Sequence, residues 1–243
     1  MRITTWNVHF GKRIEAIAKA FLDNANLAGS DIVLLQEIES HPEEGKARAE
    51  QIAERLGYHC VYAPARTKGR GSHGIAMLSR WPIASTEIIE LPFFDSPVRP
   101  RRRIALVAKV ITADGPVHVC NVHLDVRINA RQRIEQLRSL VERMKTLSPD
   151  PVIIAGDFNT SPFHFAFRLF PILPVSQRRR VERYMVQSGF SGIRRLPLTY
   201  RPAVIPMKLD HIYASGIRLT RSGVEKRVRV SDHRPVWADL VQN

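Results

Sequence analysis

Short apolar runs rich in Val, Ile and Leu recur along the whole chain, and each is bordered by residues that favour turns. Runs of this length suit strands better than helices. We predict strands at residues 3–8, 32–35, 75–78, 104–111, 117–124, 152–155, 212–214 and 236–241. Several runs follow one another directly, so strands do not alternate strictly with helices, and a Rossmann fold is disfavoured.

Three segments between the strands carry apolar residues at every third or fourth position, which predicts amphipathic helices. These segments are 12–28, 43–56 and 130–147. The last one is followed by two prolines, which end a helix before the next strand. The 243 residues suit one large domain, so we predict a single α/β domain over 1–243, with packed mixed β-sheets covered by helices.

Charge is the unusual bulk property of the sequence. It contains 37 Lys and Arg against 23 Asp and Glu, a net charge of +14. The basic residues cluster at 99–103, 127–138, 178–183 and 194–201. Such a surface attracts polyanions such as nucleic acid or anionic lipid head groups, although a solvated arginine-rich surface explains the same composition equally well.

The sequence also bears on where the protein resides. We find no apolar stretch long enough to span a bilayer, and the first residues lack the apolar region of a secretory signal. We therefore expect a soluble cytoplasmic protein, acting as a monomer. Cys60 and Cys120 are expected to be reduced thiols, because nothing in their spacing suggests a disulfide.

Polar side chains follow six apolar segments, at the edge of the predicted core. They are Asn7, Glu37, Asn121 with His123, Asp157 with Asn159, Asp210, and Asp232 with His233. A single residue of this kind is usually a turn former or a helix cap, but six of them indicate a common site. Converging strand ends would bring several carboxylates together, and such a cluster requires a cation. Oxygen ligands without a cysteine cluster favour Mg²⁺ or Mn²⁺ over zinc.

Spacing within these motifs suggests roles for their members. Residues two apart in an extended segment point to the same side, so Asp157 and Asn159 can act together. His233 needs a partner to fix its tautomer, and Asp210 is a candidate. The set suits attack of water on phosphorus, in which the metal polarises a nonbridging oxygen and His233 with Asp157 handles the proton of the water.

Seven motifs in this order resemble the endonuclease/exonuclease/phosphatase superfamily, whose members include DNase I-like nucleases, apurinic-site endonucleases, neutral sphingomyelinases and inositol polyphosphate 5-phosphatases. The motifs are Thr5-Trp6-Asn7, Gln36-Glu37, the stretch 74–80, Asn121-Val122-His123-Leu124, Gly156-Asp157-Phe158-Asn159, Leu209-Asp210-His211-Ile212 and the stretch 231–236. Each motif is weak alone, but the ordered set covers nearly the whole chain and is specific.

The resemblance implies a four-layer α/β sandwich and a set of roles. Glu37 would be the principal metal ligand, with Asn7 and Asp232 near the same ion. Asp157 and Asn159 would position the attacking water and the phosphate. His233, oriented by Asp210, would contact the phosphate or act as base, and His123 would stabilise the phosphate or the leaving group. Asn121 and Arg103 are expected to bind substrate, while Arg133 and Gln136 match a pattern that we interpret as structural.

The chain departs from the family at one motif. Many members carry Gly-Asn-Ala where this chain has Gly74-Ile75-Ala76, so a substrate contact from that position is in doubt. His73 precedes this motif, and we expect it to be an exposed loop residue.

The resemblance and the basic surface together favour a metal-dependent nuclease that acts on nucleic acid. A sphingomyelinase-like, lipid or inositol phosphate hydrolase is the alternative, and the aromatic stretch 163–170 would then line an apolar groove. That stretch is also explained as a buried helix. A noncatalytic binding module would have lost a ligand or the Asp-His pair, and every such position is filled.

Overall fold

The structure, a computed structural model, describes residues 1–95, 101–147, 149–161, 177–193, 197–200 and 207–242. The strands of this part form two six-stranded sheets. The first sheet runs in the order β11 (Ile217–Val224), β12 (Val236–Gln242), β1 (Arg2–Phe10), β2 (Ile32–Ser40), β4 (Gly71–Ser79) and β3 (His59–Lys68). The second runs in the order β5 (Ile83–Glu90), β6 (Ile104–Thr112), β7 (Gly115–His123), β8 (Val152–Asp157), β10 (Asp210–Ser215) and β9 (Ser191–Gly192).

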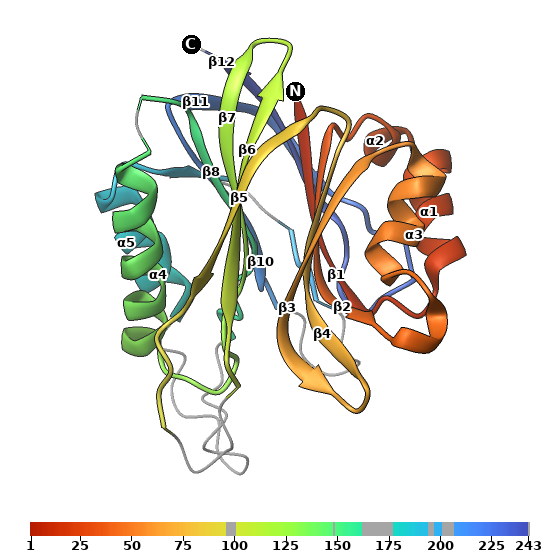
Figure 1. The fold of residues 1–243 in the computed structure, drawn as a ribbon. Coiled ribbons are helices and arrows are strands. Elements are labelled where there is room, and N and C mark those ends of the chain that lie inside the picture. Colours follow the sequence, from red (N-terminus) through yellow and green to blue (C-terminus); the bar gives the residue numbers. More distant parts are fainter. Residues whose placement is uncertain (96–100, 148, 162–176, 194–196, 201–206, 243) are drawn as a thin grey trace.

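The two sheets pack face to face, with an apolar cluster from both sheets between them. Helices α1 (Ile14–Asp23), α2 (Ala25–Ala28) and α3 (Arg48–Leu56) cover the outer face of the first sheet (Figure 1). Helices α4 (Ala130–Lys145) and α5 (Gln177–Gln187) cover the outer face of the second. The layers are therefore helix, sheet, sheet and helix, which confirms the predicted four-layer α/β sandwich with two mixed sheets.

Every predicted apolar run lies in a strand apart from Leu124, which directly follows β7. The central strands of both sheets are buried on both faces and therefore read as continuous apolar sequence. The sequence did not reveal β3, β5, β9 and β11, the four strands at the sheet edges. Strand β5 alternates between partly buried and exposed residues, so it shows no apolar run. The expectation for His73 was wrong, since this residue lies inside β4 and is buried.

Two of the predicted helices are interrupted. The segment 12–28 divides into α1 and α2 at Asn24, whose side chain accepts hydrogen bonds from the backbone N–H groups of Asn26 and Leu27 and so starts a new helix. The segment 43–56 contains a short 3₁₀ turn, η1 (Pro42–Glu44), then Gly45 with φ of +74°, and only then α3. The third helix, α4, matches the predicted segment closely.

Strand pairing in the second sheet places the ends of three strands side by side. Strand β7 pairs with β8 in parallel, and β8 pairs with β10 antiparallel. In this register, Asp157 at the end of β8 lies opposite both His123 and Asp210. Gly156 permits the pairing, because it adopts φ of +148° and a Cβ there would lie 1.9 Å from the carbonyl oxygen of Val122.

Cys60 and Cys120 are free thiols, as expected. Among the described residues, no helix has the length and apolar character that a membrane crossing requires.

Candidate active site

The row of His123, Asp157 and Asp210 forms the floor of the candidate site. Neighbouring strands in a sheet lie about 4.8 Å apart, so the register alone brings these three side chains together. All three are buried. The first sheet faces this row and contributes Asn7 from β1 and Glu37 from β2.

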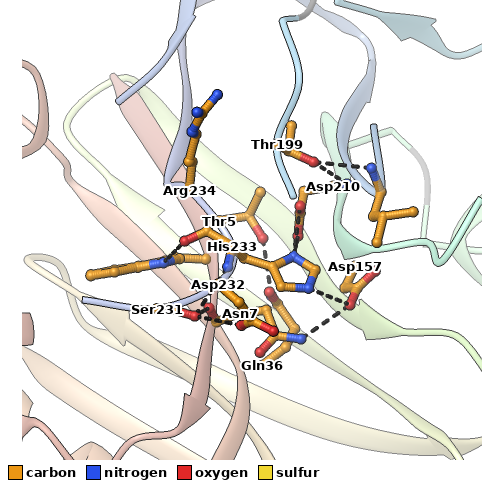
Figure 2. Close-up of polar contacts among 12 residues, drawn as sticks. Thr5, Asn7, Gln36, Asp157, Thr199, Asp210, Ser231, Asp232, His233 and Arg234 are labelled. Carbon is orange, nitrogen blue, oxygen red and sulfur yellow. Dashed lines mark hydrogen bonds and ion pairs between the residues drawn. The ribbon is translucent and has the colours of Figure 1, made fainter. Parts of the chain in front are cut away.

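His233 lies just before β12 and reaches over the row. Its Nδ1 donates to the carboxylate of Asp210, at 2.9 Å from Oδ2 and 3.1 Å from Oδ1 (Figure 2). Its carbonyl oxygen accepts a hydrogen bond from the indole N–H of Trp6, and the ring of Tyr200 packs 4.8 Å away. The imidazole is therefore fixed in orientation, as the sequence predicted for the Asp210–His233 pair.

Asp157 occupies the centre of the site. Its Oδ2 accepts a hydrogen bond from Nδ2 of Asn7 at 3.1 Å, and its Oδ1 accepts from the backbone N–H of Asn159 at 2.9 Å. The Nε2 atoms of His233 and His123 lie 3.8 and 3.6 Å from Asp157 Oδ2. Asn159 adopts a left-handed backbone with φ of +48°, a strained conformation of the kind that concentrates at functional sites.

The charges of this group are strongly perturbed. Burial raises the pKa of Asp157 to about 7, and the negative charge of Asp210 acts in the same direction. For His233, burial alone would lower the pKa, but the charges of Asp210 and Asp157 and the hydrogen bond to Asp210 outweigh it and raise the pKa to about 10. A pKa near neutrality lets Asp157 gain or lose its proton there, whereas the raised pKa of His233 keeps its imidazole cationic.

Glu37 projects from a β-bulge in β2. The register of β2 against β4 shifts between Gln36 and Ile38, and Glu37 has φ of +55°. A bulge of this kind re-aims a side chain at the edge of a site. The Glu37 carboxylate lies 3.8 Å from His123 Nε2, beyond hydrogen-bond distance, and its side chain is 24% exposed.

Asn121 supports this bulge from the other sheet. Its Nδ2 donates to the carbonyl oxygens of Leu35 and Ala76, and its Oδ1 accepts from Gln36 Nε2 at 2.7 Å. The side chain is fully buried between the sheets. These contacts favour a structural role beneath Glu37 over the substrate-binding role that we expected from the sequence.

Arg103 also lies beneath the rim. It directly precedes β6, is buried, and its Nη1 lies 2.9 Å from Nδ1 of His123. Burial lowers the pKa of His123 well below its usual value, and the charge of Arg103 lowers it further. The position of Arg103 behind His123 favours an indirect role over the substrate contact that we expected.

Asp232 lies at the exposed rim, next to Asn7 (Figure 2). Its Oδ1 lies 3.1 Å from the hydroxyl of Ser231 and 3.6 Å from Nδ1 of His9, and its side chain is 37% exposed. The Ser231 hydroxyl also donates to the carbonyl oxygen of Asn7. The loop before β12 is thereby tied to the end of β1.

A family model described as the Endonuclease/Exonuclease/phosphatase family matches residues 4–233. The chain belongs to the endonuclease/exonuclease/phosphatase family. Members of this family are phosphoester hydrolases.

Individual proteins are also similar to this chain over nearly its full length. An uncharacterized protein of Escherichia coli K12, YbhP, is 27% identical, with 98% of this chain and 95% of that protein covered. A family protein from Beutenbergia cavernae superposes with a TM-score of 0.77 at 21% identity, covering 100% of this chain and 72% of that one. The mannosyl-6-phosphatase Bt3783 of Bacteroides thetaiotaomicron superposes with a TM-score of 0.71 at 18% identity, covering 99% of both chains.

The donor set of the site fits a hard divalent cation, the cofactor that the family implies. Asp157, Asp210 and His233 offer ligand atoms within 4.8 Å of one another. In that cluster, however, Nδ1 of His233 already donates to Asp210, so a cation there would replace an existing hydrogen bond. Glu37 and Asp232 are carboxylates at the accessible rim, and their oxygens suit Mg²⁺ or Mn²⁺. The assignment of the metal to Glu37, Asn7 and Asp232 stays a prediction.

The structure thus gathers most of the predicted site residues of this family member around one point. They are Asn7, Glu37, His123, Asp157, Asn159, Asp210, Asp232 and His233. The sequence interpretation missed Tyr200 and His9. His9 lies two residues after Asn7, the last residue of the first motif, so its spacing could have identified it. Tyr200 stands in no recognisable motif, and only the tertiary fold places its ring against His233.

The structural interpretation of the Arg133 and Gln136 pattern agrees with their contacts. Arg133 is fully buried in α4 and donates to the carbonyl oxygens of Asp125 and Ile128. Gln136 donates to the carbonyl oxygen of Pro92. Both side chains hold the loops next to the site and do not reach its centre.

Proposed function

We propose that this family member is a divalent-metal-dependent phosphodiesterase that hydrolyses nucleic-acid phosphodiester bonds by attack of an activated water. The observation that carries the proposal is the setting of Asp157. Its carboxylate lies within 4 Å of two imidazoles, one of them bound to Asp210, and accepts hydrogen bonds from Asn7 and Asn159. An aligned carboxylate and imidazole next to carboxylates suited to a cation are the parts that hydrolysis of a phosphoester requires.

Asp157 is the group that we assign to proton transfer. A general base works best when its pKa lies near the operating pH, and burial raises the pKa of Asp157 to about 7. The backbone N–H of Asn159 and the amide of Asn7 hold its two oxygens in place. Asp157 would accept the proton of the attacking water.

His233 would contact the phosphate. The two neighbouring carboxylates raise the pKa of His233 to about 10, so its imidazole is a cation at neutral pH. A cation with a fixed ring orientation can stabilise the negative charge that develops on the phosphoryl oxygens. When bound at Glu37, Asn7 and Asp232, Mg²⁺ or Mn²⁺ would polarise a nonbridging oxygen of the phosphate.

The choice of nucleic acid rests on charge. The chain has a net charge of +14, and neutralisation of backbone phosphates by Lys and Arg dominates nucleic-acid binding. Arg66 lies close enough to Glu37, Arg101 and Arg127 for their charges to influence its pKa, so basic residues border the carboxylates of the site. This arrangement favours a substrate that carries phosphates beyond the scissile one.

A lipid or inositol phosphate is the alternative substrate. The aromatic stretch 163–170 that suggested it lies outside the described residues. A structural neighbour is a mannosyl-6-phosphatase, so the same fold also hydrolyses a phosphomonoester, and small phosphomonoesters belong in the test.

The test is a hydrolysis panel run with Mg²⁺, with Mn²⁺ and with EDTA. The substrates are plasmid DNA, abasic duplex, structured RNA, sphingomyelin, a phosphoinositide, mannose 6-phosphate and bis-p-nitrophenyl phosphate, with Asp157→Ala protein as the contamination control. We expect metal-dependent cleavage of nucleic acid that the variant lacks. Turnover of the lipid or sugar substrates with intact nucleic acid would overturn the nuclease assignment.

The metal assignment has its own test. Glu37→Gln should weaken Mn²⁺ binding at least tenfold by calorimetry and abolish turnover, because a neutral amide replaces the charged ligand while the fold is kept. Glu90→Gln is the matched control, since Glu90 is 78% exposed on β5. Equal Mn²⁺ affinities in wild type and Glu37→Gln would remove Glu37 from the metal site.

A further inference from the structure

Arg103 has a specific contact that its expected role in substrate binding does not explain. Its guanidinium is buried, and Nη1 lies 2.9 Å from Nδ1 of His123. Among the described residues, the Arg103 side chain makes one hydrogen bond, and its partner is His123. A guanidinium carries five N–H donors and no acceptor, so the Nδ1 atom of His123 must accept.

This contact determines where the imidazole of His123 carries its hydrogen. A neutral imidazole has one N–H, and an Nδ1 atom that accepts leaves that hydrogen on Nε2. The Nε2 atom lies 3.6 Å from Asp157 Oδ2 and 3.8 Å from Glu37 Oε1. Both distances exceed hydrogen-bond length, so the Nε2–H group is directed between these carboxylates without being bound by either.

His233 has the opposite arrangement on the other side of Asp157. Its Nδ1 donates to Asp210, because a carboxylate accepts hydrogen bonds. The two imidazoles therefore approach the same carboxylate with different partners behind them, a carboxylate for His233 and a guanidinium for His123. Nδ1 therefore carries a hydrogen in His233, where it faces a carboxylate, and none in His123, where it faces a guanidinium.

We infer that Arg103 is a positioning residue that holds His123 as the Nε2–H tautomer, so that His123 donates a hydrogen bond to the phosphoryl or leaving-group oxygen of the substrate. The second half of this inference rests on the proposed phosphodiesterase function. Arg103 itself does not touch the substrate. Its backbone is fixed at the start of the β6 ladder, where its carbonyl oxygen accepts from the N–H of Leu91.

The first test is a direct observation of the tautomer in metal-free protein. In ¹⁵N-histidine-labelled wild type, two-dimensional NMR should show Nδ1 of His123 as the unprotonated nitrogen and Nε2 as the protonated one. Arg103→Met removes the donors with little change in volume, and the His123 signals should then move to those of a mixture of tautomers. Arg103→Lys keeps a donor and should restore the wild-type pattern at least in part.

The matched control is Arg102→Met, because Arg102 is the adjacent residue and its side chain is 74% exposed. The His123 signals should not change in this variant. A wild-type spectrum with hydrogen on Nδ1 of His123 would overturn the inference, and it requires no variant to fold. An unchanged His123 tautomer in folded Arg103→Met protein would overturn it as well.

The second test is kinetic. Arg103→Met should lower kcat about tenfold to hundredfold with a change in KM below threefold, since a preorganised donor acts mainly in the transition state. Arg103→Lys should recover much of the loss. A rise in KM with unchanged kcat would instead make Arg103 a substrate-binding residue and overturn the positioning role. Absence of activity on the whole panel with the expected tautomer would overturn the proposed function and the donor role of His123, but not the effect of Arg103 on His123.

Discussion

The two sides of the candidate site hold histidines that are equally buried but differ in charge. His233 is 5% exposed and His123 is 3% exposed. Carboxylates outweigh burial for His233 and raise its pKa to about 10, whereas burial and Arg103 lower the pKa of His123 well below its usual value. Since burial is the same on both sides, the charge of the neighbouring side chain decides the charge of the imidazole.

The difference extends beyond these two residues. On the His123 side, His73 is also buried, and burial together with the charges of Arg66 and Arg103 lowers its pKa to about 3. On the His233 side, Asp157 and Asp210 supply the negative charge. The site is therefore divided into an arginine side, with neutral imidazoles, and an aspartate side, with a cationic one. Under the proposed function, a phosphoester between the two sides would meet one neutral and one charged imidazole.

The largest loss of activity is expected from substitution of Asp157, whose carboxylate lies between the two histidines. Asp157→Asn should lower kcat by ~10⁴-fold, the upper range for loss of a general base, because Asn cannot accept the proton of the water. The shape of the side chain is kept, so thermal unfolding should show a folded protein. Steady-state kinetics on the best panel substrate measure the effect. A loss below tenfold would show that neither side acts through Asp157.

A smaller loss of activity is expected from substitution of Asp210, which lies on the aspartate side behind His233. Asp210→Asn should lower kcat by about 10²-fold, because the negative charge behind His233 is lost while its ring keeps a hydrogen-bond acceptor. In metal-free protein, NMR titration should show the pKa of His233 falling from about 10 towards its usual value. The signals of His123 should stay as in wild type. A coupled change in both imidazoles would refute the division into two sides.

The smallest effect is expected on the free energy of unfolding, from substitution of His73 on the arginine side. His73 is neutral in the folded protein, with a pKa of about 3, and an unfolded chain binds its proton near pH 6.5. Between these values the unfolded state binds more protons, so this residue lowers stability as the pH falls below 6.5, by at most ~1.4 kcal/mol per pH unit. The free energy of unfolding of His73→Gln should fall less steeply between pH 7 and pH 5 than that of wild type. Urea unfolding at both pH values measures it, and equal slopes would contradict a buried neutral His73.

The sequence predicted the architecture because the strands that build it are buried on both faces. Apolar runs such as those in β8 and β7 have no other ready interpretation. Edge strands such as β5 carry polar residues on one face and gave no comparable signal. His73 was misplaced because Gly71 and Gly74 on either side of it suggest a loop. Gly74 instead permits close pairing of β3 and β4, since a Cβ there would lie 2.0 Å from the carbonyl oxygen of Ala63.

The site residues at strand ends were predictable for a related reason. Strand ends meet at one edge, so the positions of Asp157, Asp210 and His123 in the sequence are enough to group them. The direction in which a buried polar side chain points cannot be predicted from its neighbours in the sequence. Asn121 turns towards the bulge of β2, and Arg103 turns towards His123, because of groups that approach from other strands. Sequence alone could identify these residues but not what they contact.

The spacing of His123, Asp157 and Asp210 depends on strand pairing and not on the surface loops. Backbone hydrogen bonds of three paired strands set the spacing of these groups, and Gly156 allows the close pairing. Surface segments between strands can therefore vary in sequence and length while these three side chains keep their spacing. Insertion of one residue within β8, unless a β-bulge absorbed it, would turn Asp157 to the opposite face of the sheet and remove it from the row.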